Sequence, residues 1–294
     1  MFNIVAKAVI LGDRFFHPEE YQFFKIWGHL SFPHRPTENE MAIYREFIGV
    51  IPPEAQLLIL GATPELRDLA ASLELKPVVA DISAAMLAGM LGYAKLVKPT
   101  NEIWIKDNWL SMPLPERHFD TVIGDLSLRH ISPEMQDKLL MKIKELLKPE
   151  GKLIIRHHPI NPFWSNHSYK EILNDVSDFS FFNEKKYEAM GVLLSRLLDK
   201  STKDQKTNYG EIIEILESYI DKKKSKFFYS LFLQEFLMKR LYPLTKQLTS
   251  QTKEEFENLI KKYFLTERIQ HDGGYPESEF YPIYLLTLPT RQSR

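Results

Sequence analysis

The sequence contains no cysteine, which excludes disulfide bonds, thiolate metal ligands and a cysteine nucleophile. It also lacks an uninterrupted apolar run of about 18 residues, the length that a membrane-spanning helix needs. The apolar run near the N-terminus is short and is followed by Asp13, whereas a secretory signal has a longer apolar stretch and a small-residue cleavage site. We therefore expect a soluble, cytoplasmic protein without a membrane partner.

Net charge is almost absent as well, because 38 basic residues face 39 acidic ones and leave a charge of -1. Proteins that bind nucleic acid usually carry a basic excess, so nucleic acid is not an expected partner. A short basic run, Lys222–Lys226, lies beside aromatic residues and could contact RNA. We favour its interpretation as the solvated edge of a helix.

The region between about residues 56 and 159 alternates short apolar runs with helical segments. The runs expected to form strands are 57–60, 77–81, 102–106, 119–125 and 151–157. The segments between them carry apolar residues at helical spacing, most clearly in 133–151. Such alternation is typical of βαβ units, which build a parallel sheet with helices on both faces.

Four regions follow from this pattern. We expect a helical lead-in at 1–50, a Rossmann-like core at 51–160, a helical cap at 161–264 and a final strand pair at 265–294. The predicted fold class is α/β, with a doubly wound, mostly parallel seven-stranded sheet and the cap inserted before the last two strands. The cap would cover the carboxyl ends of the strands, where such sheets bind ligands.

The first expected strand runs into a tight turn at Gly61 and then into a helix. Thr63 suits the N-cap, Pro64 the first helical position and Glu65 the positive end of the helix dipole. The free N–H groups of that helix start could hold a carboxylate or phosphate. A well-capped helix after a strand explains the same residues equally well.

The second expected strand ends at Asp81, which follows Gly61 by 20 residues. An acid about 20 residues beyond the glycine turn is where nucleotide-binding α/β folds bond a ribose hydroxyl. A carboxylate suits this task because it only accepts hydrogen bonds. Alternatively, or in addition, Asp81 caps the next helix.

Three stretches together carry a resemblance to a known family: 78–87 (VVADISAAML), 106–125 (KDNWLSMPLPERHFDTVIGD) and 139–155 (LLMKIKELLKPEGKLII). They resemble the class I S-adenosylmethionine-dependent methyltransferases. The resemblance implies S-adenosyl-L-methionine as cofactor and S-adenosyl-L-homocysteine as product. It places the methionine part at the Gly61 turn, the ribose at Asp81, the adenine amino group at Asn108 and the sulfonium near Asp125. The full implied set is Gly61, Ala62, Thr63, Asp81, Ile82, Ser83, Met86, Asn108, Trp109, Asp125 and Leu126, with Ile82 and Met86 flanking the adenine.

The chain departs from the family pattern at the glycine turn. Ile59 stands where an acid is usual, and Thr63 and Glu65 stand where glycines are usual. The cofactor's ammonium therefore lacks its customary anchor, and Asp125 could replace it by a charge-assisted hydrogen bond. Arg35 could bind the cofactor carboxylate with two parallel N–H···O hydrogen bonds, although a surface arginine is the simpler interpretation.

His157 and His158 follow the fifth expected strand at the ligand edge of the sheet. Consecutive strand residues point to opposite faces, so at most one of them readily faces a pocket. We name His157 as the candidate general base for an acceptor, against the alternative of a purely structural histidine pair. The spacing of neighbouring residues gives no sign of a metal site.

The leading functional hypothesis is in-line methyl transfer to a small-molecule acceptor. A nicotinamide-dependent oxidoreductase is disfavoured, because no G-x-G-x-x-G pattern begins at Gly61. A third hypothesis is a non-catalytic partner protein that keeps the fold and the cofactor, and the reduced glycine turn motivates it.

Overall fold

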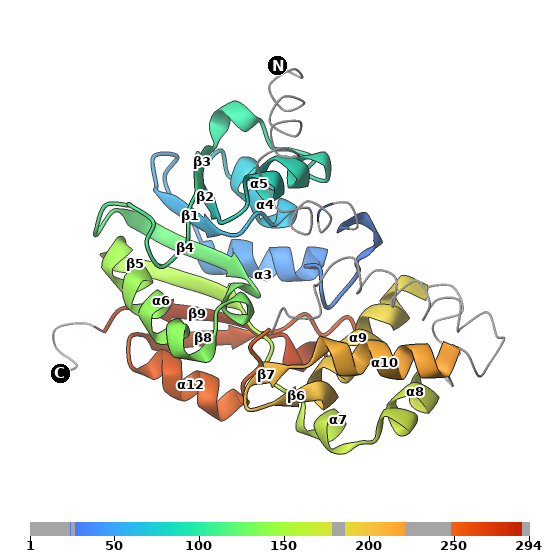
Figure 1. Ribbon diagram of the computed structural model, residues 1–294. Coiled ribbons are helices and arrows are strands. Elements are labelled where there is room, and N and C mark those ends of the chain that lie inside the picture. Colours follow the sequence, from blue (N-terminus) through green and yellow to red (C-terminus); the bar gives the residue numbers. More distant parts are fainter. Residues whose placement is uncertain (1–23, 25–26, 178–185, 221–247, 290–294) are drawn as a thin grey trace.

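The computed structural model describes residues 24, 27–177, 186–220 and 248–289. Its centre is a seven-stranded sheet in the order β3-β2-β1-β4-β5-β9-β8 (Figure 1). β1 to β5 are parallel, whereas β9 runs antiparallel to both β5 and β8. The strands are β1 (Leu57–Leu60), β2 (Val78–Asp81), β3 (Ile103–Lys106), β4 (Phe119–Asp125), β5 (Leu147–Arg156), β8 (Leu265–Gln270) and β9 (Ile283–Thr287). This architecture confirms the predicted fold class.

Helices cover both faces of the sheet. The covering helices are α3 (Glu38–Ile48), α4 (Pro64–Ser72), α5 (Ala84–Gly89), α6 (Pro133–Leu146) and α12 (Lys253–Lys261). Short 3-10 turns join them at η1 (Trp27–His29), η2 (Met90–Gly92), η3 (Pro99–Asn101), η4 (Ser127–His130) and η6 (Ser278–Phe280). α3 begins with the reciprocal cap that its T-x-x-E sequence allows, since the Thr37 side chain accepts from Glu40 N and the Glu40 side chain accepts from Thr37 N.

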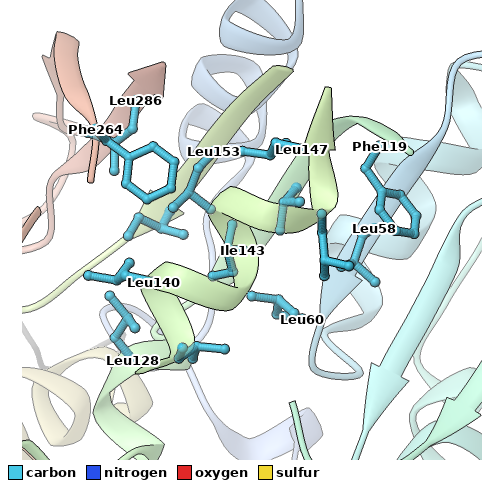
Figure 2. Close-up of a cluster of buried hydrophobic side chains, with 14 of the residues drawn as sticks. Leu58, Leu60, Phe119, Leu128, Leu140, Ile143, Leu147, Leu153, Phe264 and Leu286 are labelled. Atoms are coloured by element: carbon cyan, nitrogen blue, oxygen red, sulfur yellow. The ribbon is translucent and has the colours of Figure 1, made fainter. Parts of the chain in front are cut away.

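The alternation of side chains along each strand divides the core into two layers. Leu58 and Leu60 of β1 face the layer that contains α6 and α12, and Figure 2 shows Leu140 and Ile143 of α6 lying among these side chains. Leu57 and Ile59 face the opposite layer, which contains α3, α4 and α5. Ile59 is fully buried in this apolar layer, where an unpaired acid would be costly.

Two element boundaries differ from the sequence-based expectation. α6 ends at Leu146 rather than near Pro149, because Leu147 already pairs with Phe119 as the first residue of β5. α5 covers only Ala84–Gly89 of the longer segment that was expected to be helical, and η2 follows it directly.

The cap region contains four described helices and a short hairpin. They are α7 (Pro162–Asn166), α8 (Tyr169–Ser177), α9 (Lys186–Ser201), β6 (Thr202–Lys203), β7 (Lys206–Thr207) and α10 (Tyr209–Ile220). These helices bury their own apolar cluster, and Figure 1 shows them at the end of the sheet toward which the β4 arrow points. The basic run Lys222–Lys226 lies outside the described residues.

α12 also falls within the range 161–264 that the sequence assigns to the cap. Its side chains Phe256, Leu259 and Ile260 nevertheless pack in the core layer of β1 and α6. α12 is thus part of the sheet's covering, and the chain returns from the cap to the core before Lys253. Among the described residues, no helix combines the length and the apolar character that crossing a membrane requires.

Candidate functional site

The turn after β1 is built around Gly61, whose φ is +98°, a backbone region that favours glycine. A Cβ placed there would approach only Trp109 Cζ2, at 3.9 Å, so one side of the turn is open. Thr63 occupies the N-cap position of α4, as predicted, but its side chain makes no capping hydrogen bond. The N-terminus of α4 therefore has no side-chain cap of its own, and Ala62 and Thr63 are buried beside it.

Asp81 ends β2 at the same edge of the sheet. Its Oδ1 accepts a hydrogen bond from Ser83 N at 2.8 Å, and Ser83, rather than Asp81, caps α5 through its Oγ. The next residue, Ile82, is a large apolar side chain with 59% of its surface exposed. Met86 is half-buried on the first turn of α5 and packs against the core. An exposed isoleucine directly after the ribose candidate gives an apolar surface on which a flat ring could lie.

Asn108 and Trp109 follow β3, so their segment reaches the same edge as Asp81. The Asn108 side chain is exposed, and its oxygen accepts a hydrogen bond from Leu110 N in a local turn. The Trp109 indole nitrogen donates to Ala80 O at 2.7 Å, and its six-membered ring approaches Gly61. The indole thus lies across the ends of β1 and β2 and forms a wall between the Gly61 turn and the Asn108 segment.

The end of β4 makes a sharp turn toward η4. Gly124 cannot carry a side chain, because a Cβ would overlap Ser127 Oγ, which donates to Leu60 O at 3.0 Å. Leu126 adopts a left-handed conformation with φ +51°, which is uncommon for a leucine. Its side chain packs with Tyr275 and Tyr281 in a small apolar cluster. Backbone strain of this kind is often found at functional sites.

Asp125 belongs to a buried charge network that the sequence did not reveal. Arg156 Nε donates to Asp125 Oδ1 at 2.6 Å, and Arg156 Nη1 donates to Glu40 Oε2, also at 2.6 Å. Tyr275 donates to the other Glu40 oxygen, and the Tyr44 hydroxyl joins Gly124 O to Arg156 N. The network holds two carboxylates against one guanidinium, so it carries a net negative charge next to the turn after β4.

Glu65 adds a further carboxylate in the neighbourhood of Asp125. Arg35 Nε donates to Glu65 Oε1 at 2.5 Å, and the Trp27 indole donates to the same oxygen at 3.3 Å. Glu65 Oε2 is buried and has no hydrogen-bond partner within the described ranges. Burial raises the pKa of Asp125 to about 6, and the nearby Glu40 and Glu65 contribute to this rise against the lowering effect of Arg156. Asp125 and Glu65 therefore act on one another electrostatically.

These features fit a cationic nucleotide-like cofactor. S-adenosylmethionine carries an ammonium and a sulfonium, and the orphaned Glu65 oxygen with the carboxylate of Asp125 supplies negative charge beside the Gly61 turn. Asp81 supplies an acceptor for a ribose, and Ile82 an apolar surface for adenine. Arg35 is engaged with Glu65, so a direct contact with the cofactor carboxylate would have to be made with its remaining N–H groups.

The two histidines after β5 point in opposite directions, as strand geometry predicts. His157 is fully buried and stacks on Phe256 of α12 with ring centroids 3.6 Å apart. Neither of its ring nitrogens has a partner in the part of the chain that the structure describes. His158 stacks on Tyr281 and places its nitrogens 2.9 Å from Phe280 O and 2.9 Å from Asp199 Oδ1. Because both atoms that His158 meets are acceptors, its lone pairs are not available to a substrate.

Several residues at this edge carry no sequence signal that identifies them. Glu40, Arg156 and Asp199 are charged residues at buried positions, which only the fold brings together. The one hint was the place of Arg156, a charged residue that directly follows the buried apolar run Leu153–Ile155 at the end of β5. Among the described residues, no group of three histidine, cysteine or acidic side chains could hold a metal ion.

Comparison with known proteins places the core in a family. Residues 61–151 match the family described as "Methyltransferase domain". The ubiquinone/menaquinone biosynthesis C-methyltransferase of Psychromonas ingrahamii is 27% identical over 120 residues, which cover 36% of this chain and 47% of that protein. The matched region thus spans about half the length of this curated relative.

Solved structures share the fold at low identity. A Rhodobacter sphaeroides protein described as a Zn-dependent alcohol dehydrogenase is 16% identical, with a TM-score of 0.57 over 92% of this chain and 96% of that one. The 1,6-didemethyltoxoflavin-N1-methyltransferase of Burkholderia thailandensis is 12% identical, with a TM-score of 0.51 over 97% of this chain and 89% of that one. At these identities both likenesses show the fold alone.

The seven-stranded sheet and the match of residues 61–151 to a methyltransferase domain agree with the resemblance to the class I S-adenosylmethionine-dependent methyltransferases seen in the sequence. The fold alone would leave a nucleotide-dependent oxidoreductase open, and the domain match favours a methyltransferase.

Proposed function

We propose that this chain transfers the methyl group of S-adenosylmethionine to a small-molecule acceptor. The observation that carries the proposal is the set of acidic and apolar groups at the carboxyl ends of β1, β2 and β4, where a cationic adenosine derivative fits. The small-molecule acceptor is supported by the near-neutral net charge of the chain. It is supported further by the cap helices, which lie beyond the end of β4, where we place the acceptor (Figure 1).

We propose three contacts for the cofactor. Asp81 holds the ribose diol with its carboxylate oxygens, and Ile82 with Met86 packs on the adenine, whose amino group lies near Asn108 and Trp109. Glu65 Oε2 and Asp125 hold the ammonium, so Glu65 takes the place of the acid missing at position 59. The cofactor, when bound, supplies an electrophilic methyl group on a positively charged sulfur.

The protein's own contribution to the reaction is alignment and exclusion of water. Leu126 and its apolar neighbours Tyr275 and Tyr281 lie beside the turn after β4, where an acceptor would approach the sulfonium. The ion pairs of Arg156 with Asp125 and Glu40 hold this turn in place. An acceptor pressed between them and the cap would meet the methyl group in line.

His157 remains our proposal for the base that removes a proton from a hydroxyl or other weak acid. Burial and the charge of Arg129 hold the pKa of His157 well below its usual range, so the imidazole is neutral and its lone pair is available. Neither ring nitrogen meets a partner among the described residues. Because the side chain has no exposed surface, the acceptor must reach it from within the site.

The experiment that tests the proposed function is consumption of S-adenosylmethionine in the presence of a panel of small-molecule acceptors. Formation of S-adenosylhomocysteine that depends on one acceptor class supports it. A protein that binds the cofactor but turns over no acceptor in the panel would support the non-catalytic partner protein instead. A protein that binds neither S-adenosylmethionine nor its product contradicts both proposals.

A further inference from the structure

Arg129 is a buried cation that has no counterion among the residues the structure describes. The residue lies in η4, directly beyond the turn after β4, and only 2% of its surface is exposed. Its Nη2 donates to Ser250 Oγ at 3.0 Å, whereas its Nε is buried and has no hydrogen-bond partner. Within the part of the chain that the structure describes, no carboxylate forms an ion pair with it. An unpaired buried charge is costly, so a guanidinium in this state calls for an explanation.

The buried arginines elsewhere show that the fold normally supplies such partners. Arg67 donates to both carboxylate oxygens of Glu102 and to Leu87 O. Arg196 is paired with Asp175 and Glu277. Arg129 differs from both, because within the described ranges its side chain bonds only to a neutral hydroxyl.

Several groups gather around this guanidinium from separate elements. The charge of Arg129 lowers the pKa of His34, of His157 and of Tyr281, which come from the lead-in, the end of β5 and the segment before β9. Burial is the larger cause for both histidines, and His34 falls to about 3, so both are neutral. No negative charge is added to the group by any of these three side chains.

One acidic side chain of this neighbourhood, Asp199, faces His158 with one carboxylate oxygen, while its Oδ2 is buried without a hydrogen-bond partner among the described residues. Its Oδ1 lies 2.9 Å from His158 Nε2, and His158 also faces Phe280 O. The carboxylates of Glu40 and Asp125 are likewise committed to Arg156. Among the described residues, Arg129 Nε and Arg156 Nη2 are buried N–H donors without an acceptor, and neither ring nitrogen of His157, of which one is a donor in the neutral imidazole, has a partner.

We propose that Arg129 binds the anionic group of the methyl acceptor, so that the acceptor is a small organic acid. A carboxylate or a phosphate ester has the planar or multiple oxygen atoms that a guanidinium recognises. The apolar neighbours Leu126, Tyr275 and Tyr281 would contact the remainder of such a molecule. That the bound anion is the methyl acceptor rests on the proposed function, whereas the binding of an anion at Arg129 does not.

The first test is the thermal stability of the protein with and without simple anions. The probes are formate, benzoate and phenyl phosphate, with benzamide as the neutral counterpart of benzoate and chloride at equal ionic strength. Benzoate and phenyl phosphate should raise the Tm of the wild type, because a ligand that binds only the folded state stabilises it. Benzamide should leave the Tm unchanged. The two acids separate a carboxylate from a phosphate preference.

The variants Arg129→Met and Arg67→Met form a matched pair. Arg129→Met should raise the Tm, since it removes an uncompensated charge, and it should abolish the effect of the anions. Arg67→Met should lower the Tm, since it strands Glu102, and it should leave the effect of the anions intact. The affinity for the best acid should fall about 10- to 150-fold in Arg129→Met, as expected for a charged hydrogen bond.

Three results overturn the proposal. The first is that the anions raise the Tm of Arg129→Met as much as that of the wild type. The second is that none of them raises the Tm of the wild type. The third is that chloride raises it as strongly as the organic acids, which would mark a structural halide site. Binding of S-adenosylhomocysteine is measured in the same proteins and should be equal in the wild type and Arg129→Met. Its absence in the wild type would contradict the proposed function without touching anion binding.

Discussion

Asp125 and Arg156 are register partners at the ends of β4 and β5, and their side chains form an ion pair with Nε and Oδ1 2.6 Å apart. Both side chains are almost fully buried, and Arg156 is shared with Glu40 on α3. The pair therefore ties the strand that carries the proposed sulfonium contact to the strand that leads to His157. Its state of ionisation connects cofactor binding to pH.

The affinity for S-adenosylmethionine should fall when the pH drops below about 6. The pKa of Asp125 is raised to about 6, chiefly by burial, so the carboxylate loses its charge as the pH falls through that value. A cationic cofactor prefers the charged form, and its Kd should rise by up to about tenfold per pH unit. Calorimetric titration from pH 5 to 8 measures this. The uncharged analogue methylthioadenosine should show no such dependence, and Asp125→Asn should remove it.

The stability of the protein without cofactor should depend on pH in the opposite sense to the cofactor affinity, falling as the pH rises. A carboxyl whose pKa is higher in the folded state contributes stability that is fully present below its unfolded pKa, and this contribution is lost as the pH rises through the folded value. The stability of the wild type relative to Asp125→Asn should thus fall as the pH rises from about 4 to about 6 and stay level above that. Urea unfolding of both proteins across this range checks it, and a difference that does not change with pH would contradict the shifted pKa.

Glu65→Gln should weaken the binding of S-adenosylmethionine about 10- to 150-fold, because one charged hydrogen bond to the ammonium is lost. Methylthioadenosine lacks the amino-acid part, so its affinity should stay within about twofold of the wild-type value. Equal loss for both ligands would mean that Glu65 acts only by holding Arg35 and Trp27 in place.

Arg156→Met should destabilise the protein by about 3–5 kcal/mol, because it leaves Glu40 and Asp125 buried without their cation. Arg268→Met is the matched control, since Arg268 pairs with Glu46 at a half-exposed surface position. Its cost should stay below about 1 kcal/mol. Urea unfolding compares the two, and similar losses would show that the buried network is weaker than its geometry implies.

His157→Phe should separate a catalytic from a structural role. The imidazole is fully buried against Phe256 with both nitrogens unpaired, so a phenyl ring should keep the fold and leave the Tm at or above that of the wild type. If His157 is the base, turnover falls by about 10²–10⁴-fold while the affinity for S-adenosylhomocysteine hardly changes. Full turnover with an unchanged pH profile would make the histidine structural.

The sequence predicted the sheet well because its signals are local. Apolar runs such as 57–60 and 119–125, the glycine turn at Gly61 and the acid at Asp81 each report on a few adjacent residues. The resemblance then predicts a mostly parallel seven-stranded sheet, and the structure confirms it.

The electrostatics of the site could not be predicted in this way. Glu40, Arg156 and Asp125 are far apart in the chain, and nothing in their local sequence says that they are buried together. Glu65 illustrates the same point. The sequence indicates only a favourable charge at the start of a helix, whereas the fold leaves one Glu65 oxygen without a partner among the described residues and close enough to Asp125 to affect its pKa. Arg129 lacks any local signal, since its isolation depends on which carboxylates the rest of the fold has already paired.

The central claim is that S-adenosylmethionine binds at the carboxyl ends of β1, β2 and β4, and calorimetric titration of Asp81→Ala tests it most directly. The wild type should bind both S-adenosylmethionine and S-adenosylhomocysteine, and the variant should lose one or two charged hydrogen bonds to the ribose, each worth about 1.5–3 kcal/mol. Glu116→Ala, a change at an exposed loop residue, should bind both ligands like the wild type. Dissociation constants that are the same in Asp81→Ala and the wild type would contradict the account.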